Sequence, residues 1–224
     1  MRYYPINLDV DGRNCLVVGG GSVGTRKVKT LLSCGARVTV VSPKISAELR
    51  RLLESGQIQF MERTYRSTDL TRMFLVFGAS DNEQLNRRIH ADATQRNMLC
   101  NIADKPAVCN FILPAIVRRG DLVLTVSTSG KSPAFSKKLR KDLEKQFGEE
   151  YIEFLRLLGV IREKLLAEKH EPEAHKTLFE SLIEQGLLDL VKSGNTQRID
   201  ALLRDVLGDG FESDILLNGD AQTR

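Results

Sequence analysis

Short apolar runs alternate with longer amphipathic stretches over residues 14–102 of the chain. Runs rich in β-branched residues indicate buried strands, and apolar positions three or four residues apart indicate helices. Strands that alternate with helices favour a parallel sheet covered on both faces. We therefore predict an α/β fold with a Rossmann-type doubly wound sheet. The predicted strands are 14–18, 37–41, 58–62, 73–78 and 99–102, and the predicted helices between them are 23–33, 46–55 and 82–96.

The alternation changes after Pro106, where two further strands are predicted at 111–117 and 122–127. A helix then begins at Ser132-Pro133, because serine is a good N-cap and proline is favoured at the first helical position. Its narrow apolar stripe fits packing either on the sheet or on a second subunit. The stripe consists of Phe135, Leu139, Leu143 and Phe147.

The C-terminal part of the chain has helical periodicity throughout, with helices predicted at 151–168, 176–192 and 196–207. From Gly208 onward the sequence is rich in Asp and Gly, and we expect it to fray. The predicted order is a Rossmann domain, a dimerisation and substrate segment, a small all-α domain and a flexible tail. Their ranges are 1–113, 114–148, 149–207 and 208–224.

The composition is typical of a globular protein. The 224 residues are 42% hydrophobic and 28% charged, which excludes wholesale disorder. No apolar run approaches the roughly 20 residues that cross a bilayer, and the N-terminus lacks the apolar stretch of a signal peptide. We therefore expect no membrane partner and a cytoplasmic location.

The cysteines and the basic residues limit the classes of site further. The four cysteines form no C-x-x-C pair, so we expect reduced thiols and predict no metal site. The net charge is +4, with a basic cluster from Lys131 to Lys145 and no tryptophan in the chain. Nucleic-acid binding would need a denser basic patch with interleaved aromatics, so we predict no nucleic-acid partner. A polyanionic small molecule explains the cluster equally well.

Residues 19–24 form the pattern G-x-G-x-x-G. They follow a predicted strand and open a predicted helix, which is the context of dinucleotide-binding loops. The first glycine permits a tight turn, the second lets the backbone approach a pyrophosphate, and the third allows close helix–strand packing. The start of the helix offers free amides to the phosphates. We therefore predict dinucleotide binding by Gly19, Gly20, Gly21, Ser22, Val23 and Gly24.

The end of the second predicted strand lacks the acid that would bind the ribose hydroxyls of NAD. The chain has Ser42, Pro43 and Lys44 there instead. Ser42 fits a ribose hydroxyl and Lys44 tolerates a 2′-phosphate, so these residues leave both NAD and NADP open. Small residues after the fourth strand would let the cofactor cross the sheet edge. They are Gly78, Ala79 and Ser80, followed by Asp81 as a cap for the next helix.

Four stretches of the chain together resemble the siroheme-synthesis dehydrogenases. They are VVGGGSVGTRK (17–27), GARVTVVSP (35–43), NIADKPAVCNFILPA (101–115) and VSTSGKSP (126–133). The resemblance covers residues 1–150 well, and beyond them only the helical character matches. Many members of the family carry alanine at the position of Gly24, and we expect either residue to be small enough for helix–strand packing.

In this family, the Rossmann unit is followed by a dimerisation segment and a small helical domain. The family oxidises precorrin-2 to sirohydrochlorin with NAD⁺, and some members then insert Fe²⁺ to give siroheme. The resemblance implies NAD as the cofactor, a tetrapyrrole substrate and a homodimer, with Fe²⁺ or Co²⁺ as a co-substrate where chelation occurs. One aspartate is implicated in both steps in the family, and it matches Asp104.

The chemistry requires a base for a proton and cations for the carboxylates of precorrin-2. Asp104 follows the fifth predicted strand, in the crevice where such folds bind ligands; as an alternative, it caps the turn before Pro106. No histidine lies near the motifs. For the basic residues, the alternative to binding these carboxylates is that they form a solvated face of a helix. The candidate substrate-binding residues are Asn101, Ser127, Thr128, Ser129, Gly130, Lys131 and Lys137.

Two other functions stay open on the sequence. A non-enzymatic nucleotide-sensing Rossmann module, such as a regulator of ion transport, would bind a dinucleotide equally well. It gives no reason for the STSGKS loop at 127–132. An ordinary dehydrogenase of a small metabolite would need a catalytic His, Lys or Tyr set, and none is evident.

Overall fold

The chain folds into two compact units, residues 1–113 and 114–224, in the computed structural model. The structure describes residues 2–103, 105–167 and 172–213. The division falls at the residue where the sequence pattern placed the end of the Rossmann domain. The second unit is not divided further, so the predicted boundary near residue 148 stays a prediction. No helix in the described ranges is long and apolar enough to cross a membrane.

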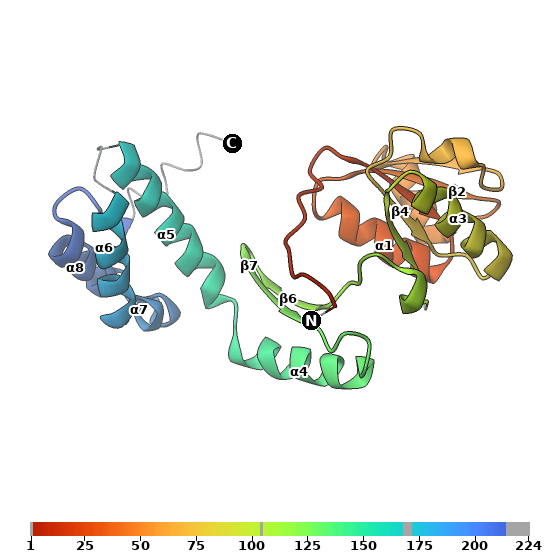
Figure 1. Ribbon diagram of the computed structural model, residues 1–224. Helices are drawn as coiled ribbons and strands as arrows, with labels where there is room; N and C mark the ends of the chain where they lie inside the picture. Colours follow the sequence, from red (N-terminus) through yellow and green to blue (C-terminus); the bar gives the residue numbers. More distant parts are fainter. Residues whose placement is uncertain (1, 104, 168–171, 214–224) are drawn as a thin grey trace. The chain divides into compact units, whose positions relative to one another are not determined.

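The first unit is built on a five-stranded parallel sheet in the order β3-β2-β1-β4-β5, seen on the right of Figure 1. This is the doubly wound order of a Rossmann fold, in which the strand order reverses beside β1. The strands are β1 (Asn14–Val18), β2 (Arg37–Ser42), β3 (Ile58–Glu62), β4 (Leu75–Gly78) and β5 (Leu99–Ile102).

Helices cover both faces of this sheet. On one face, Val28 and Leu49 pack from the helices against Val38 and Val40 of β2. On the other face, Ile89 packs with the alternate strand residues. Because both faces are covered, the central strands are apolar throughout, as the sequence pattern suggested. The helices are α1 (Ser22–Leu32), α2 (Ala47–Glu54) and α3 (Glu83–Gln95), with a short 3₁₀ helix, η1 (Ser67–Leu70), before β4.

The second unit begins with an antiparallel hairpin, β6 (Ala115–Arg119) and β7 (Leu122–Val126). Helix α4 (Pro133–Gln146) contacts both strands of the hairpin, and α5 (Glu150–Ala167) contacts β7. Buried residues of the last helices form a separate core, which includes Leu157, Leu182 and Leu203. The remaining helices are α6 (Pro172–Glu184), α7 (Leu187–Ser193) and α8 (Thr196–Leu207).

Three predicted elements differ from the structure by more than a single terminal residue. The strand predicted at 73–78 begins at Leu75. The strand predicted at 111–117 is shifted to β6, because the chain before it is hydrogen-bonded to β5: the amide of Asn110 donates to the carbonyl of Cys100 at 3.3 Å. The helix predicted at 176–192 is two helices, α6 and α7, separated at Gly186, which has a left-handed φ of 82°.

The predicted flexible tail does not begin at Gly208. Phe211 is buried in the core of the second unit, and the ammonium of Lys164 lies 4.5 Å from the centre of its ring. Ser213 donates to Asp200 from both its backbone amide and its hydroxyl, at 2.8 and 2.6 Å. Residues 208–213 therefore belong to the folded helical region, and the rest of the predicted tail lies outside the described residues.

Candidate functional site

The glycine loop lies at the carboxyl end of β1, between the ends of β2 and β4. The strand order reverses at this point, and ligands of open α/β sheets bind at such a switch point. The loop is tied to both neighbours: the amide of Gly19 donates to Val41 at 3.0 Å, and the amide of Ala79 donates to Val18 at 2.8 Å. The fold thus places the loop at the switch point, and the binding of a dinucleotide there stays a prediction.

Three of the loop's glycines are held by close backbone contacts. A Cβ added to Gly19, which has a φ of 124°, would lie 2.2 Å from the carbonyl oxygen of Ala79. A Cβ at Gly20 would lie 2.1 Å from the carbonyl oxygen of Lys44. A Cβ at Gly24 would lie 2.1 Å from the carbonyl oxygen of Gly19. These distances leave no room for a side chain, so the three glycines are required by packing alone.

The contact at Gly24 corrects one expectation from the sequence. Alanine and glycine were expected to fit equally at this position, whereas the helix here approaches the loop too closely for a methyl group. In this chain an alanine would require α1 to move away from Gly19.

Gly21 differs from the other three glycines. A Cβ added here would have nothing within 4 Å, and the residue is exposed. Gly21 is also the N-cap of α1, where it provides no side-chain capping bond, and the first turn has no acidic residue. The amide end of α1 therefore faces open space with its partial positive charge uncompensated by acid, which fits the pyrophosphate of NAD. Gly21, Ser22 and Val23 are the residues that would hold it.

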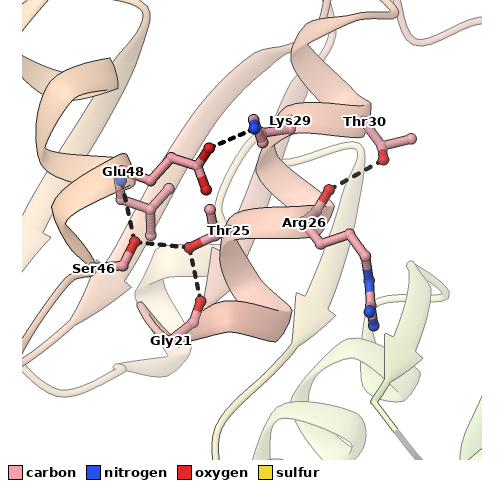
Figure 2. Close-up of polar contacts among 8 residues, drawn as sticks. Gly21, Thr25, Arg26, Lys29, Thr30, Ser46 and Glu48 are labelled. Carbon is pink, nitrogen blue, oxygen red and sulfur yellow. Dashed lines mark hydrogen bonds and ion pairs between the residues drawn. The ribbon is translucent and has the colours of Figure 1, made fainter.

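A hydroxyl pair fixes the start of α1 to the loop after β2, as Figure 2 shows. The hydroxyl of Thr25 donates to the carbonyl of Gly21 at 2.8 Å and lies 2.9 Å from the hydroxyl of Ser46. Ser46 caps α2 by accepting from the amide of Leu49, and its own amide donates to Gly20 at 2.9 Å. The segment from Ser42 to Ser46 is therefore set rigidly beside the glycine loop.

The residues at the ends of β2 and β4 have different surroundings. Ser42 is buried, whereas Pro43 is exposed. Gly78 is buried against Ile102, since an added Cβ would lie 2.6 Å from that side chain. Ser80 accepts from the amide of Asn82 at 3.1 Å. Contacts of Ser42, Pro43, Gly78, Ala79 and Ser80 with a cofactor stay predictions.

The expected cap of α3 is wrong by one residue. Asn82, and not Asp81, caps the helix by accepting from the amide of Leu85 at 3.0 Å.

The segment after β5 is folded back along that strand. The carboxamide of Asn110 donates to Met98 at 2.8 Å and accepts from the amide of Cys100 at 2.9 Å. Asn101 is buried and donates to the carbonyl of Phe111 at 3.0 Å, so its predicted substrate contact stays a prediction. The candidate base, Asp104, lies outside the described residues. The described residues on both sides of it are held firmly by these bonds.

Lys27 was not among the site residues predicted from the sequence, although its side chain lies near the carboxyl end of β4. Its ammonium lies 5.3 Å from the centre of the Phe77 ring, near the end of β4. Burial raises the pKa of the Cys109 thiol, and the positive charge of Lys27 opposes that rise. Lys27 therefore extends from α1 toward both β4 and the segment after β5. Its position one helical turn past the glycine motif was the only signal in the sequence.

The buried thiols are poor candidates for chemistry. Burial raises the pKa of Cys15 to about 11 and that of Cys100 to about 12, so both stay protonated near neutral pH. All four cysteines are free, and Cys34 is the exposed one. Among the described residues no three His, Cys, Asp or Glu side chains gather in a group that could hold a metal ion.

In the second unit, the loop from Ser127 to Ser132 is folded on itself before α4. The amide of Ser132 donates to the hydroxyl of Thr128 at 3.0 Å, and the amide of Ser129 donates to the hydroxyl of Ser127 at 3.2 Å. Ser129 and Gly130 both have left-handed backbones, with φ of 53° and 83°. The predicted N-cap is confirmed, because Ser132 accepts from the amide of Phe135 at 3.2 Å.

The cations near this loop fall into two groups. Lys138 pairs with Asp142 at 2.9 Å, and Arg140 pairs with Glu144 on the same helix. Lys131 and Lys137 are exposed and form no ion pair within the described part of the chain. Lys131 and Lys137 are therefore better placed than Lys138 and Arg140 to bind an anionic ligand.

The chain is similar to proteins of siroheme biosynthesis along most of its length. Residues 6–115 match an NAD(P)-binding family model, and residues 119–146 match the model described as sirohaem biosynthesis protein central. The siroheme synthase of Pseudoalteromonas atlantica is 34% identical over 92% of this chain, and that of Nitrosococcus oceani is 32% identical over 94%. The chain spans 45% of the length of each of these relatives, or about half.

A solved structure, described as SirC, precorrin-2 dehydrogenase, is similar to the whole fold. It matches with a TM-score of 0.76 and 31% sequence identity, and the match covers 91% of this chain and 98% of that chain. Since this match spans both proteins almost end to end, it applies to the helical unit as well as to the Rossmann unit. The chain belongs to the precorrin-2 dehydrogenase and siroheme synthase family.

Proposed function

We propose that this chain is an NAD-dependent dehydrogenase that oxidises precorrin-2 to sirohydrochlorin in siroheme biosynthesis. The observation that carries the proposal is the match to SirC, precorrin-2 dehydrogenase, over 98% of that protein. The open, uncapped amide end of α1 at Gly21 supports it, because the reaction needs a bound dinucleotide. We assign the reaction to the cytoplasm, a reducing compartment consistent with four free cysteines.

NAD⁺ supplies a hydride acceptor when it is bound. The residues that we propose to bind it lie at the carboxyl ends of β1, β2 and β4 and at the start of α1, around the switch point of the sheet. They are Gly19, Gly20, Gly21, Ser22, Val23, Gly24, Ser42, Pro43, Gly78, Ala79 and Ser80.

The carboxylate of Asp104 is our candidate for the base that takes a proton from the macrocycle. Its support is its place in the sequence, separated by Ala103 alone from the end of β5, which lies beside β4 at the carboxyl edge of the sheet. The bonds from Asn110 to Met98 and Cys100 hold the chain that follows it against the strand. Neither Cys15 nor Cys100 competes for this role, because burial keeps their thiols protonated.

We propose that the 127–132 loop of the second unit binds anionic side chains of the tetrapyrrole. A substrate contact of Asn101, on β5 of the first unit, is a separate proposal. Lys131 and Lys137 provide charge, and the amide end of α4 adds the helix dipole. The proposed contacts are made by Asn101, Ser127, Thr128, Ser129, Gly130, Lys131 and Lys137.

We also propose that the chain acts as a homodimer through the β6–β7 hairpin and α4. The hairpin has only two strands, which are marginally stable alone and leave both edges unpaired. Large apolar side chains are exposed on it: Ile116 is 42% exposed and Val123 is 45% exposed. Phe135 at the start of α4 is 51% exposed. A second copy of the chain would cover these apolar side chains. Sedimentation of the purified chain at micromolar concentration tests the proposed homodimer, and a monomer would contradict it.

The function is tested by mixing the purified protein with precorrin-2 and either NAD⁺ or NADP⁺ and following visible absorbance. Turnover is expected with the parent chain, and Asp104→Asn is expected to lose at least tenfold in kcat. No turnover with either cofactor contradicts the proposal. Binding of a dinucleotide without turnover would instead favour a nucleotide-sensing module. Adding Fe²⁺ or Co²⁺ to the same assay separates metal insertion from oxidation.

A further inference from the structure

Glu62 and Ser42 are the last residues of two neighbouring parallel strands. Ser42 of β2 is paired in register with Glu62 of β3, as Val41 is with Met61. Residues in register lie on the same face of a parallel sheet, about 4.8 Å apart. Both end at the carboxyl edge that carries the glycine loop, so Glu62 occupies the β3 side of the dinucleotide site.

This edge lacks the acid that dinucleotide-binding folds place at the end of their second strand. Ser42 stands at that position, and its short side chain is buried. A glutamate on the adjacent strand is long enough to reach the same region. An acid therefore stands one strand further out, at the position in register with Ser42.

The carboxylate of Glu62 is available for a ligand. It is exposed and forms no hydrogen bond or ion pair with any residue in the described ranges. The adjacent Arg63 is turned away from it and holds Asp69 through two bonds, at 2.6 and 2.9 Å. Lys44 is exposed at the other side of Ser42, where solvent screens its charge.

We propose that Glu62 accepts hydrogen bonds from the hydroxyls of the adenosine ribose and so selects NAD⁺ over NADP⁺. This inference rests on the proposed dinucleotide site. A 2′-phosphate would bring negative charge next to the carboxylate, and like charges in such proximity strongly oppose binding. The sequence did not distinguish NAD from NADP, because the dinucleotide-binding motif expects an acid at the end of β2 and Glu62 lies on β3.

Titration calorimetry on the full chain tests this with NAD⁺ and NADP⁺ as the probes. The parent is expected to bind NAD⁺ on the order of 100-fold more tightly than NADP⁺. Glu62→Ala is expected to weaken NAD⁺ binding about tenfold and to reduce the preference at least tenfold. The matched control is Glu54→Ala, an exposed acid at the end of α2, before β3 begins, and it should change neither affinity.

An NAD⁺ analogue without the adenosine 2′-hydroxyl gives a second measurement. The parent should bind this analogue more weakly than NAD⁺, while Glu62→Ala should bind both alike. If the variant keeps the parent's preference and its sensitivity to the hydroxyl, Glu62 is not the selecting residue, and the proposed function is unaffected. If the parent binds neither dinucleotide, the inference and the proposed function fall together.

Discussion

The hydroxyl groups of Thr25 and Ser46 lie 2.9 Å apart, joining the first turn of α1 to the N-cap of α2. Thr25 also donates to Gly21, and Ser46 also caps Leu49. The two side chains therefore connect the glycine loop to the loop after β2 (Figure 2). Because each bond is partly buried, its loss leaves a polar group that water reaches poorly.

We expect Thr25→Val to lower the free energy of unfolding by about 1–2 kcal/mol. The variant keeps the shape of the side chain and removes both of its hydrogen bonds. Chemical denaturation of the full chain measures the change. Thr30→Val is the matched control, because Thr30 is exposed and donates to Arg26 within the same helix. Equal effects of the two changes would contradict the role given to the hydroxyl pair.

Alanine substitutions at Gly21 and Gly24 should separate ligand binding from packing. Gly21→Ala adds a methyl group into open space, so the free energy of unfolding should change by less than about 1 kcal/mol while dinucleotide affinity falls at least tenfold. Gly24→Ala forces the helix away from Gly19 and should destabilise the fold by about 1–3 kcal/mol. Calorimetry and denaturation on the same samples give both quantities. An equal loss of stability in the two variants would refute the distinction.

The ion pair between Arg63 and Asp69 should make stability depend on pH in the acid range. Burial acts to raise the pKa of Asp69, but bonds from Arg63 and the amide of Arg66, with the nearby positive charge, outweigh it and lower the pKa below 3.8. A lowered folded-state pKa contributes stability that is present above the unfolded-state pKa and is lost as the pH falls through the folded-state value.

Asp69→Asn should therefore cost about 2 kcal/mol at neutral pH. The difference from the parent should shrink as the pH falls below about 4. Denaturation curves at several pH values measure it. Asp81→Asn, at an exposed site, serves as the control. A deficit that stays constant down to pH 2 would show that the ion pair is not its source.

Asn110 should support activity through the segment that follows the candidate base. Its carboxamide donates to Met98 and accepts from Cys100, so Asn110→Ala removes both bonds beside β5. We expect a loss of about 1–2 kcal/mol in unfolding free energy and a lower kcat. Asn110→Asp keeps the hydrogen-bond acceptor and loses the donor. Its unfolding free energy and its kcat should lie between those of the parent and those of Asn110→Ala. Steady-state kinetics with precorrin-2 check this, and an unchanged kcat in Asn110→Ala would contradict it.

Lys131 and Lys137, for which the described residues provide no ion-pair partner, should contribute to substrate affinity. Lys131→Gln or Lys137→Gln is expected to raise KM for precorrin-2 about two- to fivefold with little change in NAD⁺ affinity, because exposed ion pairs contribute about 0.2–1 kcal/mol each. Lys138→Gln is the control on the same helix, since Lys138 is already paired with Asp142. The assignment fails if the control raises KM as much as the other two.

Elements set by local pattern were predicted well, and elements set by tertiary contacts were not. The strands at 58–62 and 99–102 and the helix at 196–207 have the predicted bounds, because periodicity and caps are local signals. The shift of β6 arises from the bond between Asn110 and Cys100, which joins residues that no local pattern links. The helix predicted over 176–192 continues through Gly186, whereas the left-handed φ of 82° at this residue separates α6 from α7.

In the candidate site, too, the features set by local sequence were predicted and those set by tertiary contacts were not. The glycine motif located the loop at the switch point of the sheet, because dinucleotide binding, which we propose for it, requires fixed residue types at fixed spacing. The motif gave Gly21 the approach to the pyrophosphate, but it gave Gly20 no separate role, since that glycine's close contact is with the carbonyl of Lys44 after β2. The proximity of Glu62 to Ser42 depends on strand order, and that of Lys27 to Phe77 depends on how α1 crosses the sheet.

The open space beside Gly21 has a consequence for how relatives of this protein diverge. The close backbone contacts at Gly19 and Gly20 constrain these two positions through the fold itself, whether or not a nucleotide is ever bound. On the proposed function, the constraint on Gly21 comes from the ligand alone, since a side chain there meets no neighbour within 4 Å. A lineage that retained the fold and abandoned the dinucleotide would accumulate side chains there first, which makes this position a marker for members that have left redox chemistry.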